Sequence, residues 1–217
     1  MNKTHILFDL DGTLTDPGIG ITNSVAYALA HFGISVTDRS ELYRFIGPPL
    51  VDSFMEYYGM TEEQAKEAVE VYREYFADRG WAENTVYGGV EALLADLVAE
   101  GKTLLVATSK PLVFAERILI HFGLAKYFTH ICGAPLHPPK GYGKADVIRE
   151  VLDKARVTDL TTAVMVGDRH HDVDGAKAVG IESIGVLYGY GDRAEHEAAG
   201  ADTIAESVTE LRTALLP

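Results

Sequence analysis

The sequence predicts an α/β fold, in which a doubly wound, mostly parallel, Rossmann-like sheet contains an inserted helical domain. From residue 85 onward, short apolar runs alternate with segments of helical periodicity, the pattern of a parallel sheet covered by helices. A further apolar run near the start, Ile6–Phe8, is separated from this region by residues 16–84, which have helical periodicity and no strand pattern. We therefore expect a core domain from residues 1–15 and 85–217, with residues 16–84 as a helical lid.

The 217 residues carry a formal net charge of −13, with 47% hydrophobic and 24% charged residues. These proportions are typical of a globular protein, but the negative charge argues against nonspecific binding of nucleic acid polymers or anionic membranes. The single cysteine, Cys132, excludes an internal disulfide and fits a reducing compartment. No stretch resembles a signal peptide or a membrane span, so we expect a soluble cytoplasmic protein, either a monomer or a weak homodimer.

The lid is expected to be helical throughout. Thr61 with Gln64 forms a capping-box pattern, and Asp38 with Glu41 forms another, so each pair marks the start of a helix. Gly80 is a helix stop, and a Gly-Pro-Pro run interrupts the lid as a loop. The expected helices cover residues 18–31, 38–44, 50–58 and 61–80.

Strands and helices alternate in the rest of the chain. The strands are apolar runs, and several of the helices between them end at glycines such as Gly101, Gly123 and Gly180. Expected strands cover residues 103–107, 129–132, 163–166 and 183–187, and expected helices cover residues 90–100, 112–122, 144–155, 172–179 and 206–215. Because open α/β sheets bind ligands at the carboxyl ends of their strands, the polar residues that follow each strand form the candidate site.

The first strand ends in the acidic sequence Asp9-Leu10-Asp11-Gly12. Its two aspartates are two residues apart, so in extended geometry their side chains leave the same face of the strand. Two such carboxylates repel each other by about 4 kcal/mol at about 4 Å in a dielectric constant of about 20, so a positive group is needed near them. A hard divalent cation such as Mg²⁺ suits oxygen ligands. The alternative is that this tetrapeptide is only an acidic turn after a strand.

Polar residues also mark three later segments. Thr108 follows one strand and offers a hydroxyl, and Asp168 follows another. Asp172 lies four residues after Asp168 at a loop-to-helix junction, so both carboxylates can face one cation. Lys144 begins a helix after a glycine-containing loop, from which its ammonium group would reach the same crevice. The sequence therefore predicts a metal site with a lysine nearby at one edge of the sheet.

Some of these residues have simpler interpretations that the sequence leaves open. Asp172 is also a candidate helix N-cap, and Lys140, beside two prolines, competes with Lys144 for the place near the carboxylates. His170 and His171 are interpreted as loop residues, because the oxygen ligands nearby favour Mg²⁺ over a metal that prefers imidazole.

Together these stretches resemble the four motifs of the haloacid dehalogenase (HAD) superfamily, in order and at suitable spacing. The motifs are Asp9-x-Asp11-Gly12-Thr13, Thr108, Lys144, and Gly167-Asp168 followed by Asp172. The resemblance covers essentially the whole chain, and residues 16–84 resemble the C1 cap of that superfamily. Within the superfamily the chain is most similar to the phosphoglycolate phosphatase and 5′-nucleotidase-like group. Residues 45–50 and 185–191 resemble its nucleotidase branch.

The resemblance implies a Mg²⁺-dependent hydrolase of phosphate monoesters. Asp9 would be the nucleophile that forms an aspartyl-phosphate, and Asp11 would protonate the leaving alcohol and then take a proton from water. Thr108 and Lys144 would contact the transferring phosphoryl group, with Ser109 as a further substrate contact. The implied metal ligands are Asp9, the main-chain carbonyl of Asp11, Asp168 and Asp172.

The implied substrate is a small phosphorylated metabolite such as a nucleoside 5′-monophosphate, with Arg44 and Gly47 of the lid as contacts; Arg44 is equally compatible with a surface role. Phosphoglycolate hydrolysis and a β-phosphoglucomutase-like phosphomutase reaction are alternatives. Dehalogenases of this superfamily lack an acid two residues after the nucleophile, so Asp11 argues against dehalogenation. A non-catalytic phosphate-binding domain and a receiver-like domain are further alternatives, although a receiver domain would have no helical lid after its first strand.

Overall fold

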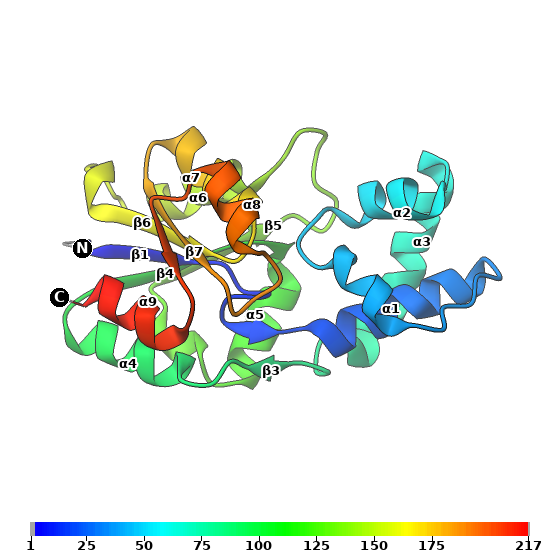
Figure 1. The fold of residues 1–217 in the computed structure, drawn as a ribbon, viewed down its shortest axis with the longest axis horizontal. Coiled ribbons are helices and arrows are strands. Elements are labelled where there is room, and N and C mark those ends of the chain that lie inside the picture. Colours follow the sequence, from blue (N-terminus) through cyan, green and yellow to red (C-terminus); the bar gives the residue numbers. More distant parts are fainter. Residues whose placement is uncertain (1–2, 217) are drawn as a thin grey trace. The chain divides into compact units, whose positions relative to one another are not determined.

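The computed structural model describes residues 3–216 (Figure 1). Within it the chain divides into two compact units. One contains the described residues up to Asp16 and from Val86 onward, and the other is the continuous segment Pro17–Thr85. Two short strands, β2 (Thr15–Asp16) and β3 (Thr85–Val86), lie where the chain passes from one unit to the other, and they pair with each other.

The discontinuous unit is built on a six-stranded sheet in the order β5-β4-β1-β6-β7-β8. Neighbouring strands are parallel throughout this order, and β1 is central. This arrangement confirms the predicted α/β class with a mostly parallel, doubly wound sheet. The strands are β1 (His5–Phe8), β4 (Thr103–Pro111), β5 (His130–Ala134), β6 (Ala163–Gly167), β7 (Glu182–Val186) and β8 (Thr203–Ala205).

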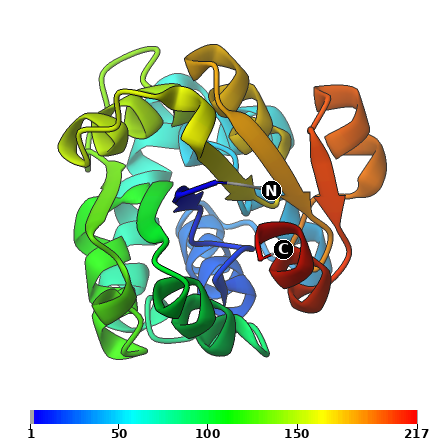
Figure 2. The same ribbon diagram turned by 90° about the vertical axis from the view of Figure 1, so that its left-hand side faces the viewer.

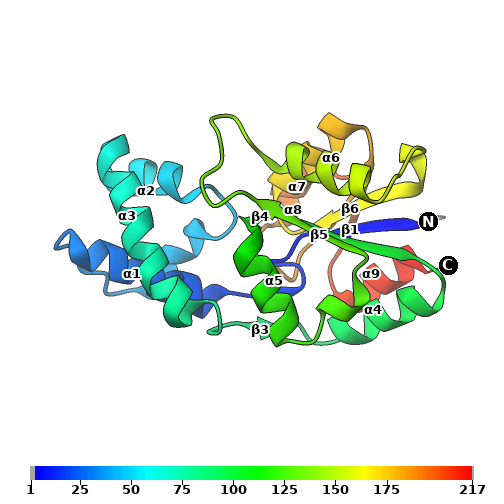
Figure 3. The same cartoon turned by 180° about the vertical axis from the view of Figure 1, so that it is seen from behind.

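Helices cover both faces of this sheet (Figure 2). Helices α6 and α7 pack against each other on one face, whereas α4 and α5 cover the opposite face, where α9 lies beside α4 (Figure 3). No helix among residues 3–216 combines the length and the apolar character needed to cross a membrane. The bounds are α4 (Val90–Ala99), α5 (Leu112–His121), α6 (Lys144–Lys154), α7 (His170–Val179), α8 (Arg193–Ala199) and α9 (Val208–Leu215).

A hydrophobic core lies between the sheet and the helices α6 and α7. Leu7, Leu105 and Met165 reach it from three neighbouring strands, and Val147 reaches it from α6; all four are fully buried. Because side chains alternate along a strand, the residues on either side of Leu7 are buried against the other face. A strand buried on both faces has no place for a charge in its interior, so the first acidic residue, Asp9, comes directly after the strand ends.

The segment Pro17–Thr85 is mainly helical. The predicted capping box at the start of α3 is present, since the Thr61 hydroxyl accepts from the Gln64 N–H at 3.3 Å and Gln64 accepts from the Thr61 N–H at 3.0 Å. The capping box predicted at Asp38 and Glu41 is wrong, because Asp38 accepts from the nearer Ser40 N–H at 2.8 Å and a 3₁₀ helix follows. The helices are α1 (Gly18–His31), a 3₁₀ helix (Arg39–Phe45), α2 (Leu50–Tyr58), α3 (Glu62–Tyr75) and a π-helical turn (Phe76–Gly80).

Other elements also differ from the prediction. Strand β4 continues past residue 107 to Pro111, because β5 still pairs with it at that point. Helix α7 begins at His170, before the predicted start at Asp172. Strand β8, of three residues, and helix α8, of seven, are not predicted, because runs this short carry too little periodicity.

Candidate active site

Three aspartates meet at the carboxyl edge of the sheet. One carboxylate oxygen from each of Asp9, Asp168 and Asp172 lies within 4.8 Å of the others, and all three residues are buried. Strands β1 and β6 are adjacent and parallel, with Phe8 beside Val166, so the aspartates that follow them emerge at the same edge. Asp172 comes from the first turn of α7. The structure thus brings together three of the four aspartates that the sequence suggests as metal ligands.

Lys144 places its ammonium group among these carboxylates. Its Nζ atom lies 2.8 Å from Asp9 Oδ1 and 2.8 Å from Asp172 Oδ1, and it donates to the Ala107 carbonyl at 3.1 Å. Burial works against the ammonium charge, but Asp172 and Asp9 outweigh that penalty and raise the pKa of Lys144 above its usual value. Lys140, its competitor in the sequence, is exposed on the loop before α6. Of these two lysines, Lys144 is therefore the one that lies beside the carboxylates.

The fourth aspartate, Asp11, pairs with Lys110, a residue to which the sequence analysis gives no role. Lys110 Nζ donates to Asp11 Oδ2 at 2.6 Å. Burial raises the pKa of the Asp11 carboxyl, and Lys110 offsets only part of that rise. The alternation of β4 is the pattern that would have identified this lysine: Thr108 and Lys110 are buried, whereas Ser109 between them is exposed.

Thr108 lies on the strand next to β1. Strand β4 is paired with β1 so that Val106 is beside Phe8, which places Thr108 near the sheet edge from which Asp9 emerges. The Thr108 hydroxyl accepts a hydrogen bond from its own strand, from the backbone N–H of Lys110 at 3.2 Å. Thr108 is therefore fixed in place at the edge that carries the aspartates.

A loop after β7 also contacts the acidic group. The backbone N–H of Tyr190 donates to Asp168 Oδ2 at 2.8 Å, and a β-carbon on Gly189 would lie 2.4 Å from Asp168 Cβ. Gly12, which also lies close to Asp168, has a φ of 80°, and a β-carbon there would lie 2.0 Å from Asp168 Oδ2. Close backbone approach from two loops therefore fixes Asp168. Sequence patterns give no sign of the Tyr190 contact, which joins residues 22 positions apart.

The two predicted substrate contacts of the lid, Arg44 and Gly47, belong to the unit Pro17–Thr85 and are exposed. The Arg44 guanidinium lies over the ring of Tyr57, 4.3 Å from its centroid. Gly47 has a φ of 104°, a conformation that side-chain-bearing residues rarely adopt. Arg44 thus has a stacking partner within its own unit, and a role toward a substrate stays a prediction for both residues.

His170 and His171 do not take part in the group of aspartates. The interpretation of both as loop residues is wrong, because they begin α7, where the Glu195 carboxylate accepts from the His170 backbone N–H at 2.7 Å. The His170 ring pairs with Asp174 at 3.0 Å, and burial lowers the pKa of His171 to about 4.

The ionisable side chains at this edge of the sheet carry a net negative charge. Besides the group of three aspartates with Lys144, this edge carries the pair of Asp11 with Lys110. Four carboxylates therefore face two ammonium groups, and two negative charges are unbalanced when all six groups are ionised. Burial, together with Asp172 and Asp9, raises the pKa of Asp168 well above its usual value. A divalent cation would remove this excess, and closely spaced carboxylate oxygens are the donor set that Mg²⁺ prefers. The residues present therefore fit Mg²⁺, with Asp9, Asp168 and Asp172 as the side chains that could hold it.

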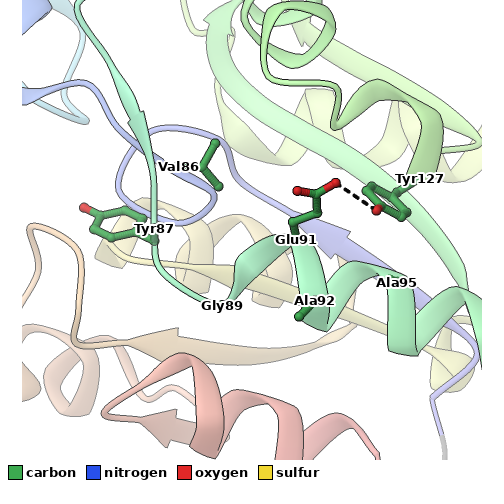
Figure 4. Close-up of a pocket in the computed structure, with 7 residues that line it drawn as sticks. All are labelled: Val86, Tyr87, Gly89, Glu91, Ala92, Ala95 and Tyr127. Carbon is green, nitrogen blue, oxygen red and sulfur yellow. Dashed lines mark hydrogen bonds between the residues drawn. The ribbon is translucent and has the colours of Figure 1, made fainter.

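A shallow cavity elsewhere in the same unit contains none of these residues (Figure 4). It has a volume of about 550 Å³, and inside it the Glu91 carboxylate accepts a hydrogen bond from the Tyr127 hydroxyl at 3.1 Å. Its lining residues are Val86, Tyr87, Gly89, Glu91, Ala92, Ala95 and Tyr127. With no lysine or cluster of carboxylates in its lining, it lacks the charge pattern of the sheet edge.

Comparisons with known proteins cover nearly the whole chain. The family model described as haloacid dehalogenase-like hydrolase matches residues 6–186. A 5′-nucleotidase of Pseudomonas aeruginosa is 46% identical over 97% of this chain and 95% of its own. Tyrosine-protein kinase PtkA of Mycobacterium tuberculosis is 42% identical over 97% of this chain and 72% of its own. The crystal structure of a predicted phosphatase from Clostridium acetobutylicum has a TM-score of 0.95 at 49% identity, with 100% of this chain and 99% of that chain covered.

Proposed function

The chain belongs to the haloacid dehalogenase-like hydrolase family, and from this premise we propose that it hydrolyses phosphate monoesters at Asp9, with Mg²⁺ as its cofactor. The family membership confirms the resemblance inferred from the sequence. The observation that most supports the proposed reaction is the group of three buried aspartates, two of which, Asp9 and Asp172, contact the Lys144 ammonium. Phosphoryl transfer has a loose transition state, so its catalysis depends mainly on positioning and charge neutralisation, which such a group can supply.

In the proposed reaction Asp9 attacks the phosphorus atom, and the bond between phosphorus and the ester oxygen breaks. Asp11 gives its proton to that oxygen as the alcohol leaves. Water then attacks the phosphorus of the aspartyl-phosphate, the bond between phosphorus and the Asp9 oxygen breaks, and Asp11 takes a proton from the water. Inorganic phosphate leaves, and both aspartates return to their starting states.

The neighbouring residues would hold the phosphoryl group during these steps. The Lys144 ammonium, 2.8 Å from Asp9 Oδ1, would reduce the repulsion between Asp9 and an anionic substrate and bind phosphoryl oxygens in the transition state. The Thr108 hydroxyl would be a further donor. When bound, Mg²⁺ supplies positive charge against the phosphoryl oxygens; its ligands would be Asp9, the main-chain carbonyl of Asp11, Asp168 and Asp172.

We propose that the substrate is a small phosphorylated metabolite, and that a nucleoside 5′-monophosphate is the leading candidate. The 46% identical relative named 5′-nucleotidase supports this choice.

We also propose that the segment Pro17–Thr85 is the C1 cap of this family, with Arg44 and Gly47 as substrate contacts. Phosphoglycolate is the alternative substrate. A phosphomutase reaction is the alternative activity, and its product would be an isomerised sugar phosphate and not inorganic phosphate. Monomeric or weakly dimeric state and cytoplasmic location stay predictions from the sequence.

A second candidate function is phosphoryl transfer to a tyrosine hydroxyl. It is favoured by the 42% identity to tyrosine-protein kinase PtkA over 97% of this chain. Incubation with ATP and Mg²⁺, followed by mass spectrometry for phosphotyrosine, separates the two functions. We expect phosphate release from monoesters and no phosphotyrosine; phosphotyrosine formed by the wild type and absent from Asp9→Asn would favour the kinase.

Hydrolysis of p-nitrophenyl phosphate by the wild type and Asp9→Asn, with Mg²⁺ or with EDTA, tests the proposed reaction. We expect Mg²⁺-dependent turnover that Asp9→Asn lowers by a factor on the order of 10³ or more, because the nucleophile is lost. Asp174→Asn is the matched control, since Asp174 is an exposed aspartate on α7 outside the acidic group. Turnover retained by Asp9→Asn would reject Asp9 as the nucleophile. A screen of nucleoside monophosphates, phosphoglycolate and sugar phosphates would then identify the substrate.

A further inference from the structure

Lys110 and Asp11 form a buried ion pair at the edge of the sheet. Their atoms Nζ and Oδ2 are 2.6 Å apart, and the two side chains are only 6% and 15% exposed. By contrast, the pair of Lys126 with Glu91 has side chains that are 60% and 57% exposed. A lysine is rarely buried unless it is paired, because desolvating the ammonium is costly. The ion pair with Asp11 therefore offsets the desolvation cost of burying the Lys110 ammonium.

The backbone around Lys110 is held from two sides. Its N–H donates to the Thr108 hydroxyl at 3.2 Å, and its carbonyl oxygen is packed against Gly133 so closely that a β-carbon there would lie 2.6 Å away. Strand β4 shifts its register against β5 between Thr108 and Pro111, the stretch that contains Lys110. The fold thus fixes the point from which the lysine side chain extends.

The two oxygens of Asp11 are in different situations. Oδ2 accepts from Lys110, whereas Oδ1 is buried and has no hydrogen-bond partner within residues 3–216. A buried oxygen without a partner is unfavourable unless a ligand or water completes its surroundings. Oδ1 is therefore the oxygen left to exchange a proton with a bound molecule.

We infer that Lys110 is a positioning residue for Asp11: by holding Oδ2, it presents Oδ1 as the atom that transfers the proton. This inference rests on the proposed function. As the bond between phosphorus and the ester oxygen breaks, the proton on Oδ1 moves to that oxygen and the alcohol leaves. In the second step, water attacks phosphorus and the bond from phosphorus to the Asp9 oxygen breaks. Oδ1 of Asp11 takes a proton from that water, which restores the carboxylic acid. Lys110 keeps its own protons throughout.

Leaving-group dependence separates this role from simple phosphate binding. An alkyl alkoxide needs a proton in order to leave, whereas p-nitrophenolate leaves readily without one. The ratio kcat/KM reports on the steps up to release of the alcohol, so it is not affected by the later hydrolysis of aspartyl-phosphate. We expect Lys110→Met to lower kcat/KM for an alkyl phosphate by about 10- to 100-fold, and for p-nitrophenyl phosphate by much less. Lys126→Met, which removes an exposed ion-paired lysine, should change neither value.

A double-mutant cycle identifies the group through which Lys110 acts. If it acts through Asp11, then Lys110→Met in an Asp11→Asn background should cause no further loss on the alkyl phosphate. Lys110→Arg keeps the positive charge, so it should restore part of the lost kcat/KM. If Lys110→Met does not fold, as judged by thermal unfolding, Lys110→Arg replaces it in the leaving-group comparison. A guanidinium cannot reproduce the position of the ammonium, so a larger loss on the alkyl phosphate is again expected.

An equal loss on both substrates, or a full additional loss in the Asp11→Asn background, would overturn the inference while leaving the proposed function intact. Absence of Mg²⁺-dependent hydrolysis by the wild type would overturn the proposed function and this inference together.

Discussion

At the scale of single residues, the site consists of buried charges that depend on their partners. Lys144 contacts Asp9 and Asp172 at 2.8 Å each and is itself almost fully buried. Removing one member of a buried ion pair leaves the other charge uncompensated, which typically costs about 3–5 kcal/mol. Lys144 therefore matters for stability as well as for the proposed chemistry.

The substitution Lys144→Met should abolish hydrolysis and lower the free energy of unfolding by about 3 kcal/mol, because two neighbouring carboxylates lose their positive partner. Urea denaturation in the presence of EDTA measures the stability effect without a contribution from Mg²⁺. Lys140→Met is the matched control, because Lys140 is exposed on the loop before α6. If Lys140→Met proved more damaging than Lys144→Met, the assignment of the site lysine would be wrong.

His196 provides a pH dependence away from the aspartates. It is fully buried, its Nε2 lies 3.3 Å from the Val186 carbonyl, and burial lowers the pKa of its ring below the usual value of 6.5. The unfolded chain therefore takes up a proton as the pH falls through about 6.5, while the folded chain does not. The contribution of His196 to stability is thus present above that pH and is lost below it.

We predict that the free energy of unfolding falls more steeply between about pH 7 and about pH 5 in the wild type than in His196→Gln. Urea denaturation at a series of pH values measures the two slopes. His137→Gln, which changes an exposed histidine, should keep the wild-type slope. Identical slopes for the wild type and His196→Gln would contradict the direction of this pKa shift.

Several site residues could be found from the sequence because of where they stand in it. Asp9, Asp168 and Thr108 come directly after apolar runs, and Asp172 and Lys144 come at or near helix starts. The pairing of Lys110 with Asp11 could not be found in this way, because it joins residues 99 positions apart and depends on the register between two strands. Local patterns identify residues at strand ends, but they do not determine which side chains meet.

At the scale of elements, the site is formed where β1, β4 and β6 end side by side. The loop from Tyr188 to Gly191 completes this edge, because its backbone donates to Asp168 and its glycine at 189 allows close approach. Such a backbone donor fixes the orientation of a carboxylate without adding charge. The loop therefore helps to fix Asp168, one of the predicted metal ligands.

The substitution Gly189→Ala should weaken Mg²⁺ binding, because the added β-carbon would lie 2.3 Å from the Gly12 carbonyl and 2.4 Å from Asp168 Cβ. We expect the Mg²⁺ concentration needed for half-maximal hydrolysis to rise by about 10-fold or more, the range seen when groups that orient metal ligands are removed. Gly88→Ala is the matched control, because a β-carbon there has no atom within 4 Å. An unchanged Mg²⁺ requirement in Gly189→Ala would exclude this role of the loop.

Long periodic elements were predicted well, and short ones were not. Helices α1 and α2 have the predicted bounds of residues 18–31 and 50–58. A stripe of apolar residues indicates the extent of α1, and a proline and a glycine flank α2. The sequence does not predict strand β8 or helix α8, since three and seven residues give little periodicity. Asp38 caps its helix as predicted, but the predicted partner is wrong, because aspartate can accept from an N–H two residues ahead as well as three.

At the scale of the whole molecule, alternating apolar runs and helices were sufficient to predict the α/β class and a parallel sheet. The parallel topology then places the carboxyl ends of β1, β4 and β6 at one edge, and this is why acidic residues from distant parts of the chain meet. The substrate could not be deduced in the same way. The proposed substrate contact of Arg44 is one between an individual side chain and a ligand, and sequence patterns do not determine such contacts.

The central claim is that Asp9 becomes phosphorylated during turnover. The most direct measurement is rapid acid quenching of the enzyme with a phosphate monoester and Mg²⁺, followed by peptide mass spectrometry. We predict a phosphoryl group on Asp9 in the wild type and on no residue in Asp9→Asn, whose hydrolysis should also be abolished. A phosphoryl group on another residue, or wild-type hydrolysis by Asp9→Asn, would contradict the account.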